Sequence, residues 1–365
     1  MLNLYQIRKE LHKIPEIGLQ EFKTKKYILN VLKQFGNIKI HEFDIPGILV
    51  EFSNGDGKYK LFRSDMDAIS VFEETNCDFQ SLHPGRMHAC GHDIHMTILI
   101  GLIEKVVHEK IEQNLLFLFQ PAEEGLGGAQ KILESEIWDK FEIFESYALH
   151  VNGALPVGTV STKPGIFFAD TEEFHVFFEG KSAHVAHPEK GHNALAAGVE
   201  FYQIFHKIMK ETSFEDSVIC EFGKMQAGTV VNAIAANCIF EGTMRSYTPN
   251  DKKKIKTILK MSTEEASENH KVKAEISYLS SFIAVNNDAA LYQKLKQRIS
   301  DLNIKFVPAE KVLTGEDFGF FAEKYGGLLF WLGANQGEIH DLHSTKFLPD
   351  EKAIDVGIKV FMSLI

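Results

Sequence analysis

The stretch RMHACGHDIHM, residues 86–96, gathers three histidines, a cysteine and an aspartate within eleven positions. Zinc takes sulfur, nitrogen and carboxylate ligands at about 2.0–2.3 Å, so Cys90 and His92 could place a thiolate and an imidazole around one cation. His88 and His95 would then support the site or cap the following helix. A glycine-marked loop before a helix, with the cysteine packed as a small apolar side chain, explains the stretch equally well. The stretch alone therefore leaves a metal site and a structural loop as alternatives.

A second polar motif, PAEEG, follows the apolar run NLLFLFQ at residues 114–120. Adjacent glutamates on a turn can divide tasks, because one can bind a metal while the other takes a proton from water as general base. We assign the proton to Glu123 and the metal to Glu124. The reverse assignment remains open, and so does a turn whose two carboxylates are only solvated.

Other polar residues also follow apolar runs. Asp65 and Asp67 lie in RSDMDAI, His150 lies in YALHV, and His343 lies in LHSTKF. Each has an ordinary explanation as a solvated or satisfied side chain. Ligands of open α/β sheets bind beyond the carboxyl ends of the strands, so we expect these residues to converge at one edge. The expected set exceeds what one cation needs and suits a pair of cations; it comprises Cys90, His92, Glu124, His150 and His343.

The elements that must position these residues alternate between strands and helices. The runs GILVEF, YKLFRS, NLLFLFQ, SYALHV and LLFWLG predict strands, and the third is apolar throughout, as in a parallel strand covered on both faces. Between two of these runs, HDIHMTILIGLIEKVVHEK predicts an amphipathic helix with Asp93 as its N-cap. This alternation predicts an α/β fold.

A different order begins at residue 171. The patterns predict β-α-β-β-α-β, the ferredoxin-like arrangement that folds as a four-stranded sheet with two helices on one face. We therefore expect a catalytic domain with a mostly parallel sheet and flanking helices over residues 1–170 and 285–365. A smaller α+β domain over residues 171–284 would interrupt it.

Composition limits the partners and the location of the chain. Lysine and arginine total 39 against 50 acidic residues, a net charge of −11, which argues against a nucleic acid partner. No apolar run reaches the roughly 18 residues of a membrane span, and the first residues lack the features of a signal peptide. Four scattered cysteines do not form a disulfide scaffold. We expect a cytoplasmic protein with reduced thiols.

Seven motifs in this order and spacing resemble the dinuclear-metal amidohydrolases, a family that includes aminoacylases, hippurate hydrolases and auxin-conjugate hydrolases. The resemblance covers essentially the whole chain. Within the family, the opening segment and the stretch around Cys90 look closest to the enzymes that deacetylate N-acetyl-LL-diaminopimelate. The motifs are RSDMDAI, GRMHACGHD, LFLFQPAEEGLGGA, YALHV, GTVVNAI, TGEDFGFF and LHSTKF.

The resemblance implies two divalent metal ions, most readily zinc, with cobalt, nickel and manganese as alternatives. It matches Glu123 to the general base and leaves open whether Asp65 or Asp67 supports the site. The implied substrate is a small N-acyl amino acid. A broader N-acyl amino acid hydrolase, a dipeptidase and a catalytically dead metal-binding homologue are the alternative functions. The implied ligands are Cys90, His92, Glu124, His150 and His343.

The inserted domain resembles the lid of this family, which mediates dimerisation, so the resemblance implies a homodimer. His184 resembles a lid histidine that approaches the substrate, although a simple loop histidine is the alternative. Asn232 and Arg245 resemble lid residues that could hold a substrate carboxylate, for which the planar arginine fork is suited. A structural salt bridge is the alternative for Arg245. In TGEDFGFF, the acidic pair at 316–317 could start a helix, support the metal site or bind a substrate amine.

Overall fold

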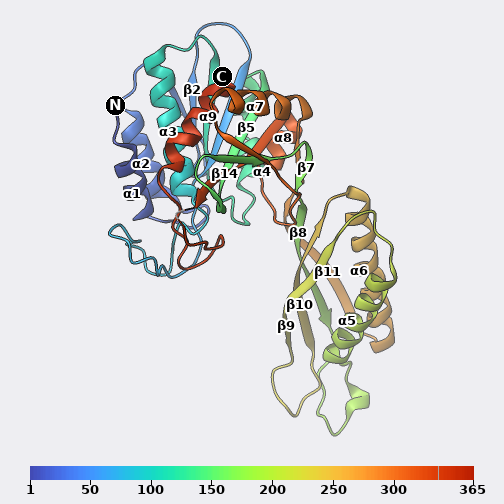
Figure 1. The fold of residues 1–365 in the computed structure, drawn as a ribbon. Helices are drawn as coiled ribbons and strands as arrows, with labels where there is room; N and C mark the ends of the chain where they lie inside the picture. The colour runs from blue at the N-terminus through green and yellow to red at the C-terminus, as the bar shows by residue number, and fades with distance from the viewer. Residues whose placement is uncertain (336) are drawn as a thin grey trace. The chain divides into compact units, whose positions relative to one another are not determined.

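The computed structural model describes residues 1–335 and 337–365, which divide into two compact units. The first unit comprises Met1–Phe167, Val285–Lys311 and Glu316–Ile365. The second comprises Phe168–Ala284 and Val312–Gly315. Both ends of the chain thus belong to the first unit, and Figure 1 follows the chain through both units.

The first unit is built on a sheet with the strand order β1-β2-β4-β3-β5-β14-β6-β13, and β7 pairs separately with β12. Its strands are β1 (Lys39–Glu42), β2 (Ile48–Phe52), β3 (Tyr59–Asp65), β4 (Asn114–Gln120), β5 (Ile143–Pro156), β6 (Thr159–Thr162), β7 (Gly165–Phe168), β12 (Val285–Asn287), β13 (Lys305–Pro308) and β14 (Gly327–Asn335). Its helices are α1 (Leu4–His12), α2 (Phe22–Leu32), α3 (His92–Glu109), α4 (Gly128–Leu133), η1 (Glu136–Lys140), α7 (Ala289–Asp301), α8 (Gly319–Tyr325) and α9 (Ala353–Leu364).

The centre of this sheet is parallel. Strands β4, β3, β5 and β14 run in one direction, and β3 and β4 are buried along their whole length. The register pairs Asp65 with Gln120, so the carboxyl ends of β3 and β4 lie level. The predicted α/β fold with a mostly parallel sheet is confirmed, and its central strands end at one edge.

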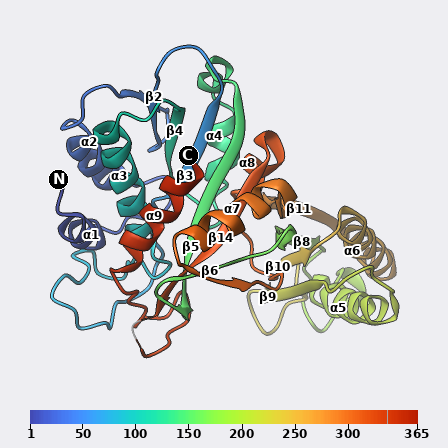
Figure 2. The ribbon, with the colours of Figure 1, turned by 45° about the horizontal axis from the view of Figure 1, so that its top comes forward.

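Helices cover both faces of the sheet (Figure 2). Helices α3 and α9 pack against each other, and α1 packs against α3, while α4 and α8 contact the sheet from the opposite face. Most of α3 is buried because it lies between the sheet and these neighbours. Even so, the described helices include none that combines the length and apolar character needed to cross a membrane.

The start of α3 differs from the prediction. Gly91, not Asp93, is the N-cap, with a left-handed φ of 88° that glycine adopts without strain. Asp93 lies inside the first turn and is fully buried, where it accepts hydrogen bonds from Arg8 Nε at 2.8 Å and from His12 Nδ1 at 2.8 Å. The predicted cap was wrong because Asp93 is held by charged partners from α1, which lie too far away in sequence to be read locally.

The second unit contains β8 (Asp170–Glu179), η2 (Pro188–Lys190), α5 (Ala194–Glu211), β9 (Ile219–Ala227), β10 (Asn237–Ser246), α6 (Pro249–His270) and β11 (Lys273–Phe282). Its antiparallel sheet has the order β11-β8-β10-β9. Helices α5 and α6 pack against each other and contact this sheet, on the same face in Figure 1. Phe174, Phe201 and Phe240 are among the buried side chains between the sheet and the helices. This unit therefore has an apolar core of its own.

Candidate metal centre

The polar residues predicted after the central strands gather at one edge of the first unit. Strand β3 ends with Asp65, and Asp67 follows two residues later; both are fully buried. His150 lies within β5, where the register places it beside Trp331 of β14. The loop into α3 adds Cys90 and His92. We call Cys90, His92, Glu124, His150 and His343 the strand-end cluster.

Cys90 and His92 flank the glycine that begins α3. A Cβ atom at Gly91 would lie 2.3 Å from Val151 Cγ2, so only glycine lets this turn approach β5 so closely. The turn brings Cys90 Sγ to 3.2 Å from His150 Nε2. His92 completes this trio, whose ligand atoms all lie within 4.8 Å of one another, and all three side chains are buried.

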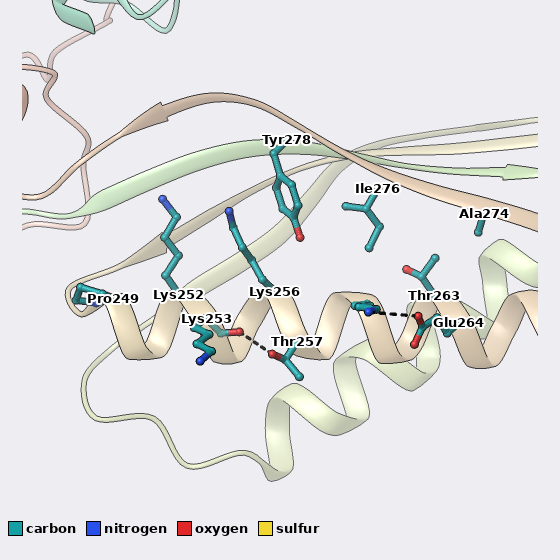
Figure 3. A pocket seen from close by; sticks show the side chains of 11 residues that line it. Pro249, Lys252, Lys253, Lys256, Thr257, Thr263, Glu264, Ala274, Ile276 and Tyr278 are labelled. Atoms are coloured by element: carbon teal, nitrogen blue, oxygen red, sulfur yellow. Dashed lines mark hydrogen bonds and ion pairs between the residues drawn. The ribbon is translucent and has the colours of Figure 1, made fainter.

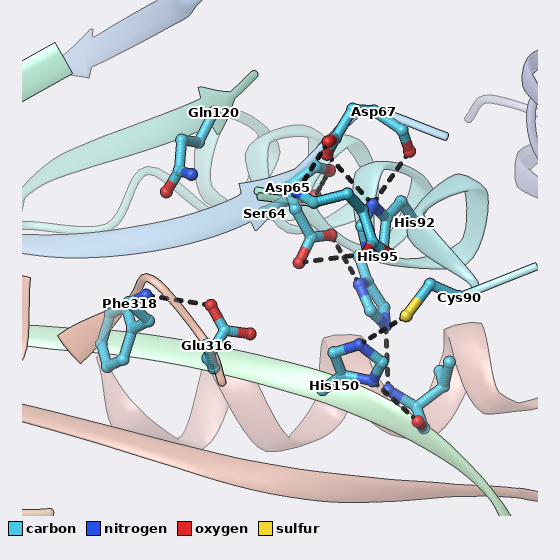
Figure 4. A network of polar contacts seen from close by, with 12 residues as sticks. Ser64, Asp65, Asp67, Cys90, His92, His95, Gln120, His150, Glu316 and Phe318 are labelled. Atoms are coloured by element: carbon cyan, nitrogen blue, oxygen red, sulfur yellow. Dashed lines mark hydrogen bonds and ion pairs between the residues drawn. The ribbon is translucent and has the colours of Figure 1, made fainter. Parts of the chain in front are cut away.

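The two buried imidazoles are oriented by backbone carbonyl groups. His92 Nδ1 lies 2.9 Å from the Asp67 carbonyl oxygen, and His150 Nδ1 lies 2.8 Å from that of Val151. Nδ1 must donate in both bonds, so Nε2 is the nitrogen of each ring that a metal ion could take. His92 Nε2 has no hydrogen-bond partner among the described residues. Figure 4 shows Cys90 and His150 pointing toward each other beside His95.

The turn after β4 orients the two glutamates. Ala122 has a left-handed φ of 58°, and its N–H donates to Glu21 Oε1 at 2.8 Å. The Glu124 N–H donates to Asp67 Oδ2 at 2.9 Å, which joins this turn to the end of β3. Glu124 Oε1 lies 3.2 Å from Nε2 of His343. Two more possible ligand groups result: Cys90 with Glu124 and His343, and His92 with Glu123 and Glu124.

His343 is the exposed member of the cluster. Its side chain is 52% exposed, whereas that of Glu124 is 17% exposed. Its backbone N–H donates to the Ala89 carbonyl at 2.8 Å, which ties the His343 loop to the loop that carries Cys90. All five members of the cluster therefore lie together in the first unit.

Both candidate aspartates contact His92. Asp65 Oδ2 lies 3.8 Å from His92 Nε2, and Asp67 Oδ1 lies 3.4 Å from His92 Nδ1. Asp65 also accepts a hydrogen bond from His95 Nδ1 at 2.7 Å. His95 Nε2 accepts one from the Val151 N–H at 2.9 Å, so both of its nitrogens are occupied. His95 is therefore suited to support the site rather than to bind an ion.

Sequence reasoning missed Arg63, which is buried in β3 beside the cluster. Its guanidinium lies 2.9 Å from Asp65, 3.1 Å from Glu316 and 2.7 Å from Asp317. The acidic pair of TGEDFGFF is thus part of a buried ion-pair network, and α8 begins only at Gly319. An arginine in the middle of a predicted central strand, two residues before Asp65, was the signal, because a buried charge needs partners.

The electrostatics of the edge follow from burial and from closely spaced carboxylates. Burial, together with the neighbouring Glu316 and Glu124, raises the pKa of Glu123 well above its usual range. Burial lowers the pKa of His150 to about 3. Burial also acts against a charged His92, but the Asp65 and Asp67 carboxylates outweigh it and raise its pKa to about 10. A raised pKa makes the Glu123 carboxylate a stronger base, which suits it to accept a proton.

The donor atoms of the strand-end cluster are of the kinds that bind a divalent metal ion. The Cys90 thiol lies within hydrogen-bond distance of His150 Nε2, at 3.2 Å, and Glu124 Oε1 lies 3.2 Å from His343 Nε2. The buried His92 Nε2 has no hydrogen-bond partner among the described residues. Leaving buried polar atoms unpaired costs about 1–3 kcal/mol each. Sulfur, imidazole nitrogen and carboxylate oxygen are the donors that zinc-type divalent ions take.

The residues predicted in the inserted segment lie in the second unit. His184 and Asn232 are exposed and lie on neighbouring loops, because the Val185 N–H donates to the Asn232 carbonyl at 3.2 Å. His184 Nδ1 accepts a hydrogen bond from the backbone of Ala186 at 3.1 Å. Arg245 of β10 is partly buried, and its Nη1 donates to the Leu313 carbonyl at 2.8 Å.

The second unit also has a groove of about 630 Å³ between α6 and β11 (Figure 3). Lysines line it, but Lys252 pairs with Asp170 at 2.6 Å and Lys256 pairs with Glu172 at 2.8 Å. The Lys256 ammonium also lies 4.0 Å from the centre of the Tyr278 ring. None of the predicted site residues lines this groove, and these lysines are already neutralised.

Comparison with known proteins identifies the family of the chain. The chain is 40% identical to an N-acetyldiaminopimelate deacetylase of Bacillus velezensis over 98% of its own length and 96% of the relative's. It is 39% identical to the enzyme of the same name from Bacillus subtilis, with the same shares covered. A solved structure of a dinuclear metal binding M20 peptidase from Bacillus subtilis superposes with a TM-score of 0.83 at 28% identity, covering 99% of this chain and 96% of that one. The model of peptidase family M20/M25/M40 matches residues 61–365. The chain therefore belongs to peptidase family M20/M25/M40.

Proposed function

We propose that this protein hydrolyses the amide bond of N-acetyl-LL-diaminopimelate and releases LL-diaminopimelate and acetate, a step of lysine biosynthesis. The observation that carries the proposal is the buried Glu123 beside a cluster of cysteine, histidine and glutamate side chains whose ligand atoms lie within metal-binding distance of one another. Relatives named N-acetyldiaminopimelate deacetylase, 36–40% identical over nearly the whole chain, support the choice of substrate. A cytoplasmic location would suit this biosynthetic role.

We assign two divalent ions to the strand-end cluster, and the Cys90 thiolate favours zinc. His150 would hold one ion together with Cys90 and His92, while Glu124 and His343 would hold the second ion. The overlap of the ligand groups at Cys90 supports a pair of adjacent ions. When bound, such ions polarise a carbonyl oxygen and lower the pKa of water. Asp65 and Asp67 would orient His92.

Glu123 would move the proton during hydrolysis. Its high pKa allows it to take a proton from the attacking water and to return that proton to the leaving amine. Arg63, through Asp65, Glu316 and Asp317, would hold the surrounding carboxylates in place. The chain thus supplies the base and a rigid frame around it.

We assign residues 171–284, whose elements would follow the ferredoxin-like order, to a lid and dimerisation domain. Residues 1–170 and 285–365 would form the catalytic domain. His184 would stabilise the oxyanion, and Asn232 and Arg245 would bind a substrate carboxylate. The exposure of His184 and Asn232, with loops that lie side by side, supports a role in contacting a ligand. The functional form would then be a homodimer.

Steady-state rates on N-acetyl-LL-diaminopimelate, hippurate and a panel of dipeptides test this proposal. We expect the highest kcat/KM on N-acetyl-LL-diaminopimelate, with acetate as the second product. A Glu123→Gln variant is the control for contaminating hydrolases. A preference for hippurate or for a dipeptide would contradict the proposed substrate, and the absence of hydrolysis on all three with ions supplied would contradict the proposed activity.

A further inference from the structure

A second group of metal-binding side chains lies in the first unit, apart from the strand-end cluster. It comprises His12 at the end of α1 and Glu73 and Cys77 in the loop between β3 and α3, and we call it the α1 cluster. His12 is fully buried, and the side chain of Glu73 is 4% exposed. Cys77 is a free, partly buried thiol. One nitrogen, one oxygen and one sulfur ligand are therefore held together within 4.8 Å.

The separations in the α1 cluster are within about 0.2 Å of those expected for ligands around one small ion. His12 Nε2 lies 3.1 Å from Glu73 Oε1, and Cys77 Sγ lies 3.7 Å from the same oxygen. Bond lengths of about 2.0–2.3 Å at tetrahedral angles place neighbouring ligand atoms about 3.3–3.6 Å apart. Small shifts of the two loop side chains would therefore suffice for binding.

The other nitrogen of His12 is already oriented as metal-binding histidines require. His12 Nδ1 lies 2.8 Å from Asp93 Oδ2, and the same oxygen accepts a hydrogen bond from Arg8 Nε at 2.8 Å. A carboxylate that accepts from Nδ1 fixes the ring and directs the Nε2 lone pair at the ion. His12 Nε2 faces Glu73 Oε1.

Charge balance also permits an ion here. Without one, a protonated His12 lies between the carboxylates of Asp93 and Glu73, with Arg8 beside Asp93. A divalent ion would replace the proton at His12 Nε2 and the proton of the Cys77 thiol, and both protons would be released to solvent. Two positive charges replace two protons, so the net charge of the cluster does not change.

We propose that His12, Glu73 and Cys77 bind one further divalent cation of the zinc class, separate from the strand-end cluster. The ion would fasten the loop around residues 73–77 to the end of α1. Through Asp93, it would also stabilise the start of α3, where His92 lies next in sequence. Its role would be structural, and amide hydrolysis does not require it.

The test is to count Cd²⁺ ions per chain after exhaustive chelation, reloading and removal of unbound metal. We expect the wild type to bind one more ion than Cys77→Ala or Glu73→Gln. Cys220→Ala, which removes a buried thiol of the second unit, is the matched control and should bind as many as the wild type. Because the result is a difference, it does not depend on how many ions the strand-end cluster holds or on the proposed substrate.

A second readout uses the wild type alone, so it does not rely on a variant that could fold poorly. We expect Cd²⁺ to slow the alkylation of Cys77 by iodoacetamide at least ten-fold, followed by mass spectrometry of the peptide that contains it. Equal ion counts for the wild type and Cys77→Ala, or a Cys77 alkylation rate that Cd²⁺ leaves unchanged, would overturn the proposal.

Discussion

The two units hold their candidate functional residues in opposite ways. In the first unit, Glu123, His92 and His150 are buried, and hydrogen bonds or ion pairs fix the side chains around them. In the second unit, His184 and Asn232 are exposed on loops. Burial makes charged and polar groups costly unless they are paired, so the candidate residues of the first unit are held in one geometry by their partners. The second unit can contribute only through what its surface contacts.

The largest effect is expected at the buried base. Glu123→Gln keeps the shape of the side chain but cannot accept the proton, so we expect kcat to fall by about 10²–10⁴-fold. Bound metal, measured by elemental analysis, should stay unchanged. Glu112→Gln changes an exposed glutamate of the same unit and should keep full activity. Wild-type kcat in Glu123→Gln would contradict the assignment of Glu123 as the general base.

A smaller loss is expected in the second unit. His184→Ala should lower kcat by about 10²-fold if the imidazole stabilises the oxyanion, because removing one such donor costs about 10²–10³-fold. His187→Ala, three residues away on the same exposed segment, is the matched control and should be neutral. Equal kcat values for His184→Ala and His187→Ala would contradict the proposed role of His184 in stabilising the oxyanion.

The next expected effect is a difference in metal affinity between variants of the two aspartates beside His92. Asp65→Asn should weaken metal binding by about 10–100-fold, because Asp65 contacts His92 and also holds His95 and Arg63. Asp67→Asn should weaken it less, since the His92 ring also bonds to the Asp67 carbonyl, which the substitution leaves in place. Competition with a chelator measures both affinities. A larger loss for Asp67→Asn would reverse this order.

The smallest effect concerns stability and pH. Burial and the nearby Asp67 raise the pKa of Glu21 from about 4.5 to about 8. Between these values the unfolded chain loses the proton while the folded chain keeps it, so Glu21 favours folding less as the pH rises, by at most about 1.4 kcal/mol per pH unit. The metal-free Glu21→Gln variant should therefore gain stability relative to the wild type from pH 5 to pH 8. Urea midpoints measure this, and a parallel pH dependence in the two proteins would contradict it.

Much of the fold could be predicted because its signals are local. The apolar run at 114–120 forms β4, and the patterns around 194–211 and 249–270 form α5 and α6. The predicted N-cap at Asp93 failed because its partners, Arg8 and His12, lie 85 and 81 residues away.

The same distinction applies to the site. The convergence of polar residues could be predicted from the rule for strand ends, since Asp65 and Gln120 lie level in adjacent parallel strands. The network of Arg63 with Glu316 and Asp317 could not, because it joins residues about 250 positions apart that no local pattern connects. The assignment of each residue to an ion, a proton or a substrate group stays a prediction.

The most direct test of the proposed function is acetate release from N-acetyl-LL-diaminopimelate by the chelated protein as divalent ions are returned. We expect no turnover without ions and turnover that rises with added Zn²⁺, Co²⁺ or Mn²⁺ in the wild type but not in Glu123→Gln. Full activity after exhaustive chelation would contradict it, because the buried cluster would then have no part in the reaction.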